Sequence, residues 1–126
     1  FRMRLDAHSC ALGKAMLAYK SFEELKEIYK SYSLHKHTEN TITSLDKLYI
    51  ELRKIRSLGY SVNQAETFDY VHGVGTAILN SQQRAVAAIS LSGTRSSINM
   101  KTIPLLSKKI IETSNEISSK LIKAVS

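Results

Sequence analysis

Two neighbouring stretches of the sequence alternate between large and very small side chains. In "VHGVGTAIL", residues 71–79, the small positions are Gly73, Gly75 and Ala77. In "AVAAISLS", residues 85–92, the small positions are Ala88, Ser90 and Ser92, and they alternate with Ala87, Ile89 and Leu91. Because successive side chains of a strand point to opposite faces, each stretch is predicted to be a strand with one bulky face and one small face.

The segment between these strands predicts an antiparallel hairpin. Residues 80–84, "NSQQR", are polar and turn-like, and consecutive strands this close pair with each other. A shift of the pairing by one residue would place large and small side chains on the same face of the sheet. We therefore expect the bulky faces of the two strands to form one face of the sheet that packs in the core. Ser90 is then expected near Gly73 or Gly75. With Ser92 it makes a patch of sheet that has two hydroxyls and no large side chain.

Helix signals precede and follow the strands. The first predicted helix covers residues 9–18 with Ser9 as N-cap, and the second follows a capping box of Ser21 and Glu24. The third lies between an N-cap at Ser44 and a C-cap at Gly59, and the last begins near Pro104. A short strand at Tyr60–Val62 completes the pattern of three helices, three strands and a last helix. This order predicts an α+β domain whose antiparallel sheet is flanked by helices.

The composition indicates one globular domain in a reducing compartment. The chain has 126 residues, 43% of them hydrophobic, and its one cysteine, Cys10, cannot form an internal disulfide. No apolar run reaches the ~18 residues of a membrane helix, so we expect a cytoplasmic protein that does not contact a membrane. The net charge of +7 fits an anionic partner or ordinary solvated lysines, and no arginine-rich stripe predicts direct nucleic-acid binding by this stretch.

The start of the chain indicates that sequence is missing before it. The first residue is Phe1, and "FRMRL", residues 1–5, has the character of the end of another strand. A sheet of three strands is also narrow for four helices to cover, which again indicates that strands precede this sequence.

Two interpretations of the small face stay open. In the first, a helix packs tightly on the glycines and alanines. In the second, the face is the floor of a small polar pocket in which Ser90 and Ser92 are donors. An anionic ligand would also want backbone N–H groups, which the start of the 9–18 helix near Ala11 and Leu12 would supply.

The Gly13-Lys14 pair does not make a phosphate-binding loop. That motif needs a glycine where this sequence has His8, and a serine or threonine where it has Ala15. A catalytic cysteine needs a base and a group that orients the base. Cys10 is close in sequence to His8, but a lone cysteine is most often a small buried hydrophobe. We therefore predict no catalytic residue.

Other polar residues give weaker signals. His35 and His37 flank a lysine in a polar loop that has no cysteine or carboxylate at ligand spacing, so no metal site is predicted. Glu66 and Asp69 are two acids that nothing in the sequence places over a substrate, and solvated loop acids are commoner. His72 can face the rim of the pocket or solvent. No motif requires a cofactor.

Three segments, in the same order and at the same spacing, resemble the IclR family of bacterial transcription regulators. "AHSCALGKAMLAY" (7–19) is similar to the family's "lHatalGKalLA", and "HTENTITSLDKLYIELRKIRSLGYSVN" (37–63) to its "lT.nTit....L..eL..ir.rGya.d". "AVAAISLSGTRSSIN" (85–99) is similar to its "vvaAlsvsGp..r.." strand and loop. The resemblance runs over nearly the whole chain without gaps.

The resemblance implies a domain organisation and a set of partners. Residues 1–126 are expected to be the later part of a GAF-like, profilin-like α+β effector-binding domain. The N-terminal part of that domain and the winged helix-turn-helix DNA-binding domain are absent from this chain, so DNA is an expected partner only through the absent domain. The expected effector is a small organic acid or sugar derivative, and the expected assembly is a homodimer or homotetramer.

The resemblance also implies an effector site. The family's pocket positions fall on the backbone amides of Ala11 and Leu12 and on Asn63, Gly73, Ser90 and Ser92. The serines and amides are the groups that the analysis of strand faces also indicates. This chain departs from the family in three places, with neutral Asn63 for an acid, "YVHG" (70–73) for "GvrC", and Ala77 for a proline. A lost carboxylate and extra room at Gly73 predict a larger or more negatively charged effector.

The leading hypothesis is a ligand-sensing module without enzymatic activity. A bound metabolite would shift the population between two arrangements of the domain and so change how distant DNA-binding domains sit on an operator. Two alternatives stay open. One is an enzyme on a GAF-like fold that uses Cys10, which would need a resolving cysteine or another reductant. The other is a pure oligomerisation module, which a filled pocket near Ser90 would favour.

Overall fold

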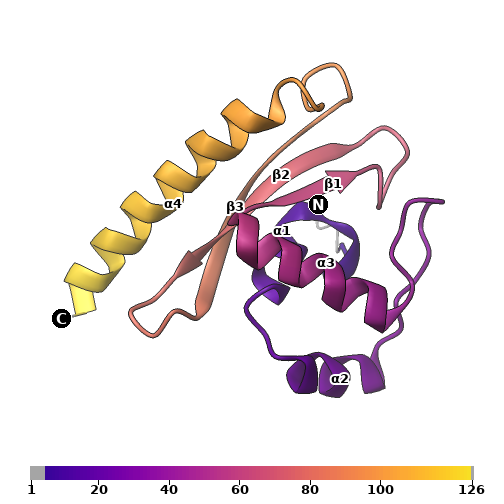
Figure 1. Ribbon diagram of the computed structural model, residues 1–126, viewed down its shortest axis with the longest axis horizontal. Coiled ribbons are helices and arrows are strands. Elements are labelled where there is room, and N and C mark those ends of the chain that lie inside the picture. Colours follow the sequence, from indigo (N-terminus) through magenta and orange to yellow (C-terminus); the bar gives the residue numbers. More distant parts are fainter. Residues whose placement is uncertain (1–4, 126) are drawn as a thin grey trace, which may run out of the picture.

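The protein is an α+β domain in which helices cover both faces of a small antiparallel sheet. The computed structural model describes residues 5–125. Its elements, in chain order, are the 3-10 helix η1 (Ala7–Ser9), α1 (Ala11–Leu17), α2 (Phe22–Ser31), α3 (Leu45–Leu58), β1 (Ser61–Gln64), β2 (His72–Leu79), β3 (Ala85–Gly93) and α4 (Ile103–Val125). Figure 1 shows α4 along one side of the sheet and α1, α2 and α3 on the other side. The predicted fold class is confirmed, while the strand tail expected at the start falls on residues that, Leu5 aside, lie outside the described ones.

The capping signals predicted two of the helices correctly. The hydroxyl of Ser21 accepts from the amide of Glu24, and the Glu24 carboxylate accepts from the amide of Ser21, so the capping box that opens α2 is complete. Ser44 caps α3 by accepting from the amide of its third residue. Gly59 ends α3 with φ of +85°, a left-handed conformation that glycine adopts without strain.

The first helix differs from its prediction. A single helix at residues 9–18 capped by Ser9 was expected, but the segment forms η1 and the shorter α1, and Cys10 is the N-cap. Ser9 is the last residue of η1, where its amide and its hydroxyl both donate to the carbonyl oxygen of Asp6 at 3.1 Å, so α1 begins later, at Ala11. The Cys10 sulfur accepts from the amide of Gly13 at 3.4 Å in its place.

The sheet has the order β1-β2-β3 and is antiparallel throughout. Gly75 pairs with Ser90, and Gly73 pairs with Ser92. This is one of the two pairings that the alternation of side-chain size allowed for Ser90, and the small positions of β2 and β3 share one face of the sheet.

The bulky face of the sheet packs against α4. Val74 is completely buried there and forms a core cluster with Ile98 and Ile110, against which Ile89 of β3 and Leu106 also pack. The expectation that the bulky faces lie together in a core is therefore confirmed. Within residues 5–125, no helix combines the length and the apolar character needed to span a bilayer.

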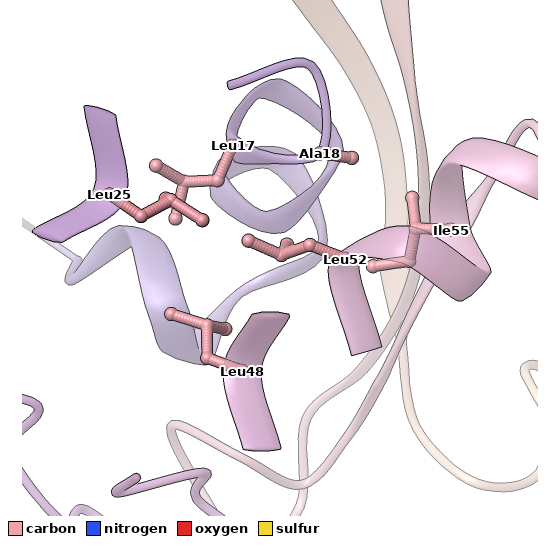
Figure 2. Packing of buried hydrophobic residues seen from close by; sticks show 6 residues of the cluster. All are labelled: Leu17, Ala18, Leu25, Leu48, Leu52 and Ile55. Atoms are coloured by element: carbon pink, nitrogen blue, oxygen red, sulfur yellow. The ribbon is translucent and has the colours of Figure 1, made fainter. Parts of the chain in front are cut away.

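A second core joins α1, α2 and α3 to one another. Figure 2 shows its six buried members, which are Leu17, Ala18, Leu25, Leu48, Leu52 and Ile55. The side chains of α2 and α3 thus bury themselves on α1, and α1 in turn lies against the sheet. The position of α1 over the small face depends on this helical layer.

Replacing Leu48 by alanine should lower the free energy of unfolding by about 2–5 kcal/mol, because it leaves a cavity in a fully buried site of the helical core. Ile50, which is 70% exposed on the same helix, is the matched control, and Ile50→Ala should change stability by less than about 0.5 kcal/mol. Urea unfolding of both variants measures the difference. Equal effects would contradict the packing of α3 described above.

Candidate small-molecule site

The start of α1 lies directly on the glycines of β2. A Cβ added to Gly75 would sit 2.8 Å from the carbonyl oxygen of Ala11, and a Cβ added to Gly73 would sit 3.4 Å from the Ala11 Cβ. The hydroxyl of Ser61 donates to the same carbonyl oxygen at 2.6 Å. Over β2, therefore, the small face is covered by a closely packed helix, as one of the two interpretations predicted.

Beside β3 the same face is open and forms a cavity of about 450 Å³. Its walls are the segment before and at the start of α1, the loop between β1 and β2, and β3. The lining residues are Leu5, Ala7, Cys10, Ala11, Leu12, Gly13, Asn63, Thr67, Phe68, Val71, Ser90 and Ser92. Leu5 and Leu12 are 49% and 42% exposed, so the cavity opens to solvent between them.

Five of the six effector-site residues expected from the sequence line this one cavity, and only Gly73 does not. A Cβ added to Gly73 would lie 3.3 Å from the carbonyl oxygen of Leu91 and 3.4 Å from the Ala11 Cβ, so the space left by the missing side chain is closely bordered. The room expected at Gly73 therefore does not extend this cavity. Asn63 is buried, and its Oδ1 accepts from the amide of Glu66 at 2.8 Å.

The lining of the cavity combines a few polar groups with an apolar surround. Hydroxyls come from Ser90, Ser92 and Thr67, and an amide from Asn63. No charged side chain is among the lining residues of the described chain. Such a cavity favours a ligand that is held by hydrogen bonds and by contact with leucine, phenylalanine and valine.

A buried lysine ties two of these walls together. Lys14 of α1 has a side chain with no solvent exposure, and its Nζ lies 2.9 and 3.1 Å from the two carboxylate oxygens of Glu66. The same Nζ donates to the carbonyl oxygen of Val62 at 2.7 Å and lies 3.2 Å from a carboxylate oxygen of Glu51. A buried ammonium group is stable only when its donors are satisfied in this way.

Further hydrogen bonds continue from the ion pair to the cavity wall. Glu66 Oε2 also accepts from the amide of Gln64 at 2.9 Å, which orders the loop that follows β1. The hydroxyl of Thr67 donates to the carbonyl oxygen of Ser9 at 2.6 Å. The β1–β2 loop is thus joined to the start of α1 both through Lys14 and through Thr67.

Several residues that the sequence singled out are not brought together. Glu66 is buried on Lys14 whereas Asp69 is exposed, so the two acids do not form a catalytic pair. His72 is half-buried at the start of β2 and does not line the cavity. Thr67 and Phe68, which lie between the two acids in sequence, do line it. The sequence carried no periodic signal for them because they lie in an irregular loop.

Cys10 lacks the surroundings of a catalytic nucleophile. Burial raises the pKa of its thiol, and this effect outweighs the hydrogen bond from the Gly13 amide and the nearby charge of Lys14. The nearest histidine in sequence, His8, forms no hydrogen bond with this thiol, and its Nε2–H donates to the carbonyl oxygen of His35 at 2.9 Å. A thiol that stays protonated is a poor nucleophile.

An antiparallel α+β domain with a polar cavity already formed between a helix and the sheet is the architecture of a small-molecule-binding domain. The family described as "Bacterial transcriptional regulator IclR C-terminal" has a sequence model that matches residues 3–119. The chain therefore belongs to the IclR family, as its motifs indicated.

Characterised relatives agree with this assignment. The transcriptional repressor AllR of Klebsiella pneumoniae is 31% identical over 118 residues, which are 94% of this chain and 43% of that protein. The crystal structure of Thermotoga maritima IclR is 38% identical and superposes with a TM-score of 0.88 over 95% of this chain and 49% of that one. The Agobacterium tumefaciens repressor BlcR is 30% identical, also with a TM-score of 0.88, over 97% of this chain and 51% of that one. The chain thus spans about half the length of these relatives.

Replacing Lys14 by methionine should destabilise the protein by about 3–5 kcal/mol, because the Glu66 carboxylate is left buried without its cation. Adding Glu66→Gln to Lys14→Met should recover part of this loss. Lys26→Met is the control, because its ion pair with Glu23 is exposed and should contribute less than about 1 kcal/mol. Chemical unfolding at neutral pH measures all three. A Lys14→Met variant as stable as the parent would contradict the role given to this ion pair.

Alkylation of Cys10 by iodoacetamide should be slower at pH 7 than alkylation of a cysteine in an unstructured peptide, because the raised pKa leaves less thiolate. The rate should begin to rise only at a pH above that at which the peptide thiol ionises. Mass spectrometry of the reaction over a pH series measures this. If Cys10 were alkylated faster than the peptide cysteine at pH 7, its thiol would be an activated nucleophile and the prediction would be wrong.

Proposed function

We propose that this chain is the effector-sensing part of a transcription regulator, and that the effector binds in the cavity beside β3. The observation that carries the proposal is the convergence on one cavity of Ala11, Leu12, Asn63, Ser90 and Ser92. These residues come from three separate parts of the chain, and the sequence resemblance selected them independently of the cavity. Family membership and the regulator names of the relatives support the same function.

The chemistry of the lining supports a small polar effector, such as a small organic acid or a sugar derivative. Hydroxyls and an amide converge on it, and Asn63 stands where the family has an acid. With no carboxylate in the lining, a ligand carboxylate would meet no repulsive charge there. Apolar contact from Leu12, Phe68 and Val71 would hold the carbon skeleton.

The effector would act by changing the balance between two arrangements of the domain. A ligand that contacts both β3 and the β1–β2 loop binds best when these walls are close, and it stabilises that arrangement by its difference in affinity. In the complete regulator this shift would reach DNA through a winged helix-turn-helix domain outside this chain. We place that regulator in the cytoplasm as a homodimer or homotetramer, with residues 1–126 forming part of the effector domain.

The two alternative functions have less support. Burial raises the pKa of the Cys10 thiol, and no histidine or carboxylate among residues 5–125 is hydrogen-bonded to it, so we propose that the chain has no enzymatic activity. A pure oligomerisation module would have its small face packed shut, whereas an open cavity lies against Ser90 and Ser92.

The test is thermal unfolding of the chain against a panel of small carboxylates and sugar acids. An effector present at about 100 times its dissociation constant should stabilise the native state by about 2.7 kcal/mol, which gives a clear rise in melting temperature. The double variant Ser90→Ala, Ser92→Ala should lose this rise, because it removes both hydroxyls from the cavity.

Ser81→Ala is the matched control. Ser81 lies exposed in the turn between β2 and β3, outside the cavity, and its removal should leave the response to the effector unchanged. If no compound raises the melting temperature of the parent across a broad panel, the oligomerisation alternative becomes the better one. If a compound stabilises the parent and the double variant equally, it binds elsewhere.

A further inference from the structure

Three side chains that can hold a metal ion meet where η1 contacts the loop between α2 and α3. Asp6 precedes η1, His8 is part of η1, and His37 belongs to the loop. One ring nitrogen of each histidine and one carboxylate oxygen of Asp6 all lie within 4.8 Å of one another. None of the three lines the cavity beside β3, so this cluster is separate from the proposed effector site.

The ring of His8 is held in one tautomer. The residue is 1% exposed, and its Nε2–H donates to the carbonyl oxygen of His35 at 2.9 Å. A neutral imidazole that carries its proton on Nε2 has its free lone pair on Nδ1, and no hydrogen bond within the described residues uses that nitrogen. Histidines that bind metal ions almost always donate their other ring N–H to a carbonyl, carboxylate or water in this manner.

The other two groups are already paired and can adjust. His37 Nε2 lies 2.8 Å from Asp6 Oδ2, and the rings of His8 and His37 are stacked with centroids 6.1 Å apart. Ligand atoms at about 2.0–2.1 Å from a tetrahedral zinc ion lie about 3.3 Å from one another. The side chains of His37 and Asp6 are 34% and 45% exposed, so they have the freedom to close the remaining distance.

We propose that Asp6, His8 and His37 bind one divalent transition-metal ion, with Zn²⁺ as the best fit. Two imidazoles and one carboxylate suit zinc, whereas magnesium and calcium prefer oxygen ligands alone. Water completes the four ligands at the exposed side. Coordination replaces the hydrogen bond between His37 and Asp6, and His37 binds the ion as a neutral imidazole whose proton lies on the other ring nitrogen.

The ion joins two segments that are far apart in sequence. Asp6 lies between Leu5 and Ala7, which both line the cavity, and His37 lies in the loop after α2. A metal bridge between them fixes this wall of the cavity against the helical layer. Zinc should therefore raise the melting temperature of the chain even without any effector.

The experiment is a titration of the metal-free full chain with Zn²⁺ alone, followed by competition with a chromophoric chelator. We expect one zinc ion per chain and a dissociation constant in the low micromolar range or tighter. His37→Ala and Asp6→Asn should each weaken binding at least about tenfold, a loss typical of disturbed zinc sites. Both side chains are partly exposed, so these variants should fold, which circular dichroism checks.

Two control variants separate this site from others. His72→Ala removes a histidine outside the cluster and should bind zinc like the parent. Cys10→Ser should also bind like the parent, and Co²⁺ in place of zinc should show no thiolate charge-transfer band. The proposal is overturned if the parent binds no zinc in this range, if His37→Ala keeps the parent's affinity, or if either control loses as much affinity as His37→Ala.

Discussion

The buried ammonium group of Lys14 is the interaction on which the arrangement of this domain depends. It sits in the middle of α1 and contacts Glu66 in the β1–β2 loop, Val62 in β1 and Glu51 in α3. One side chain thus relates the helix over the small face to the sheet, to the neighbouring loop and to the helical layer. Replacing such a pair with apolar residues is often neutral for stability, so its role here is to fix position. The start of α1 packs on the glycines of β2 and forms one wall of the cavity that Ser90 and Ser92 of β3 also line.

Much of the sheet could be predicted from the sequence because it follows from a strict alternation of side-chain size. The alternation excludes registers that are shifted by one residue and leaves Ser90 near Gly73 or Gly75, and the structure pairs it with Gly75. Local caps were equally informative at Ser21 and Gly59, where the signal and its partner are a few residues apart. The small face itself left a packed helix and a polar pocket open as alternatives, and the structure has the helix over β2 and a cavity beside β3.

What could not be predicted depends on partners that are distant in sequence. Lys14 drew attention only as part of a failed phosphate-loop motif, and its carboxylates are 37 and 52 residues away. Cys10 replaced Ser9 as the cap because Ser9 belongs to the preceding 3-10 turn and α1 begins only at Ala11. His37 was set aside for want of a nearby carboxylate, which Asp6 supplies from 31 residues away. Sequence motifs describe residues that are close along the chain, so they do not predict contacts between residues that are far apart in sequence.

The two faces of β2 and β3 have different roles, one in the core and one in the cavity. Val74 and Ile89 pack in the core under α4 and stabilise the fold, whereas Ser90 and Ser92 line the cavity and contribute little to stability. Exchanging a small side chain for another in the cavity changes stability little, because no packed volume depends on it. Under the proposed function, single substitutions among the residues that line the cavity would therefore change ligand preference without changing the fold.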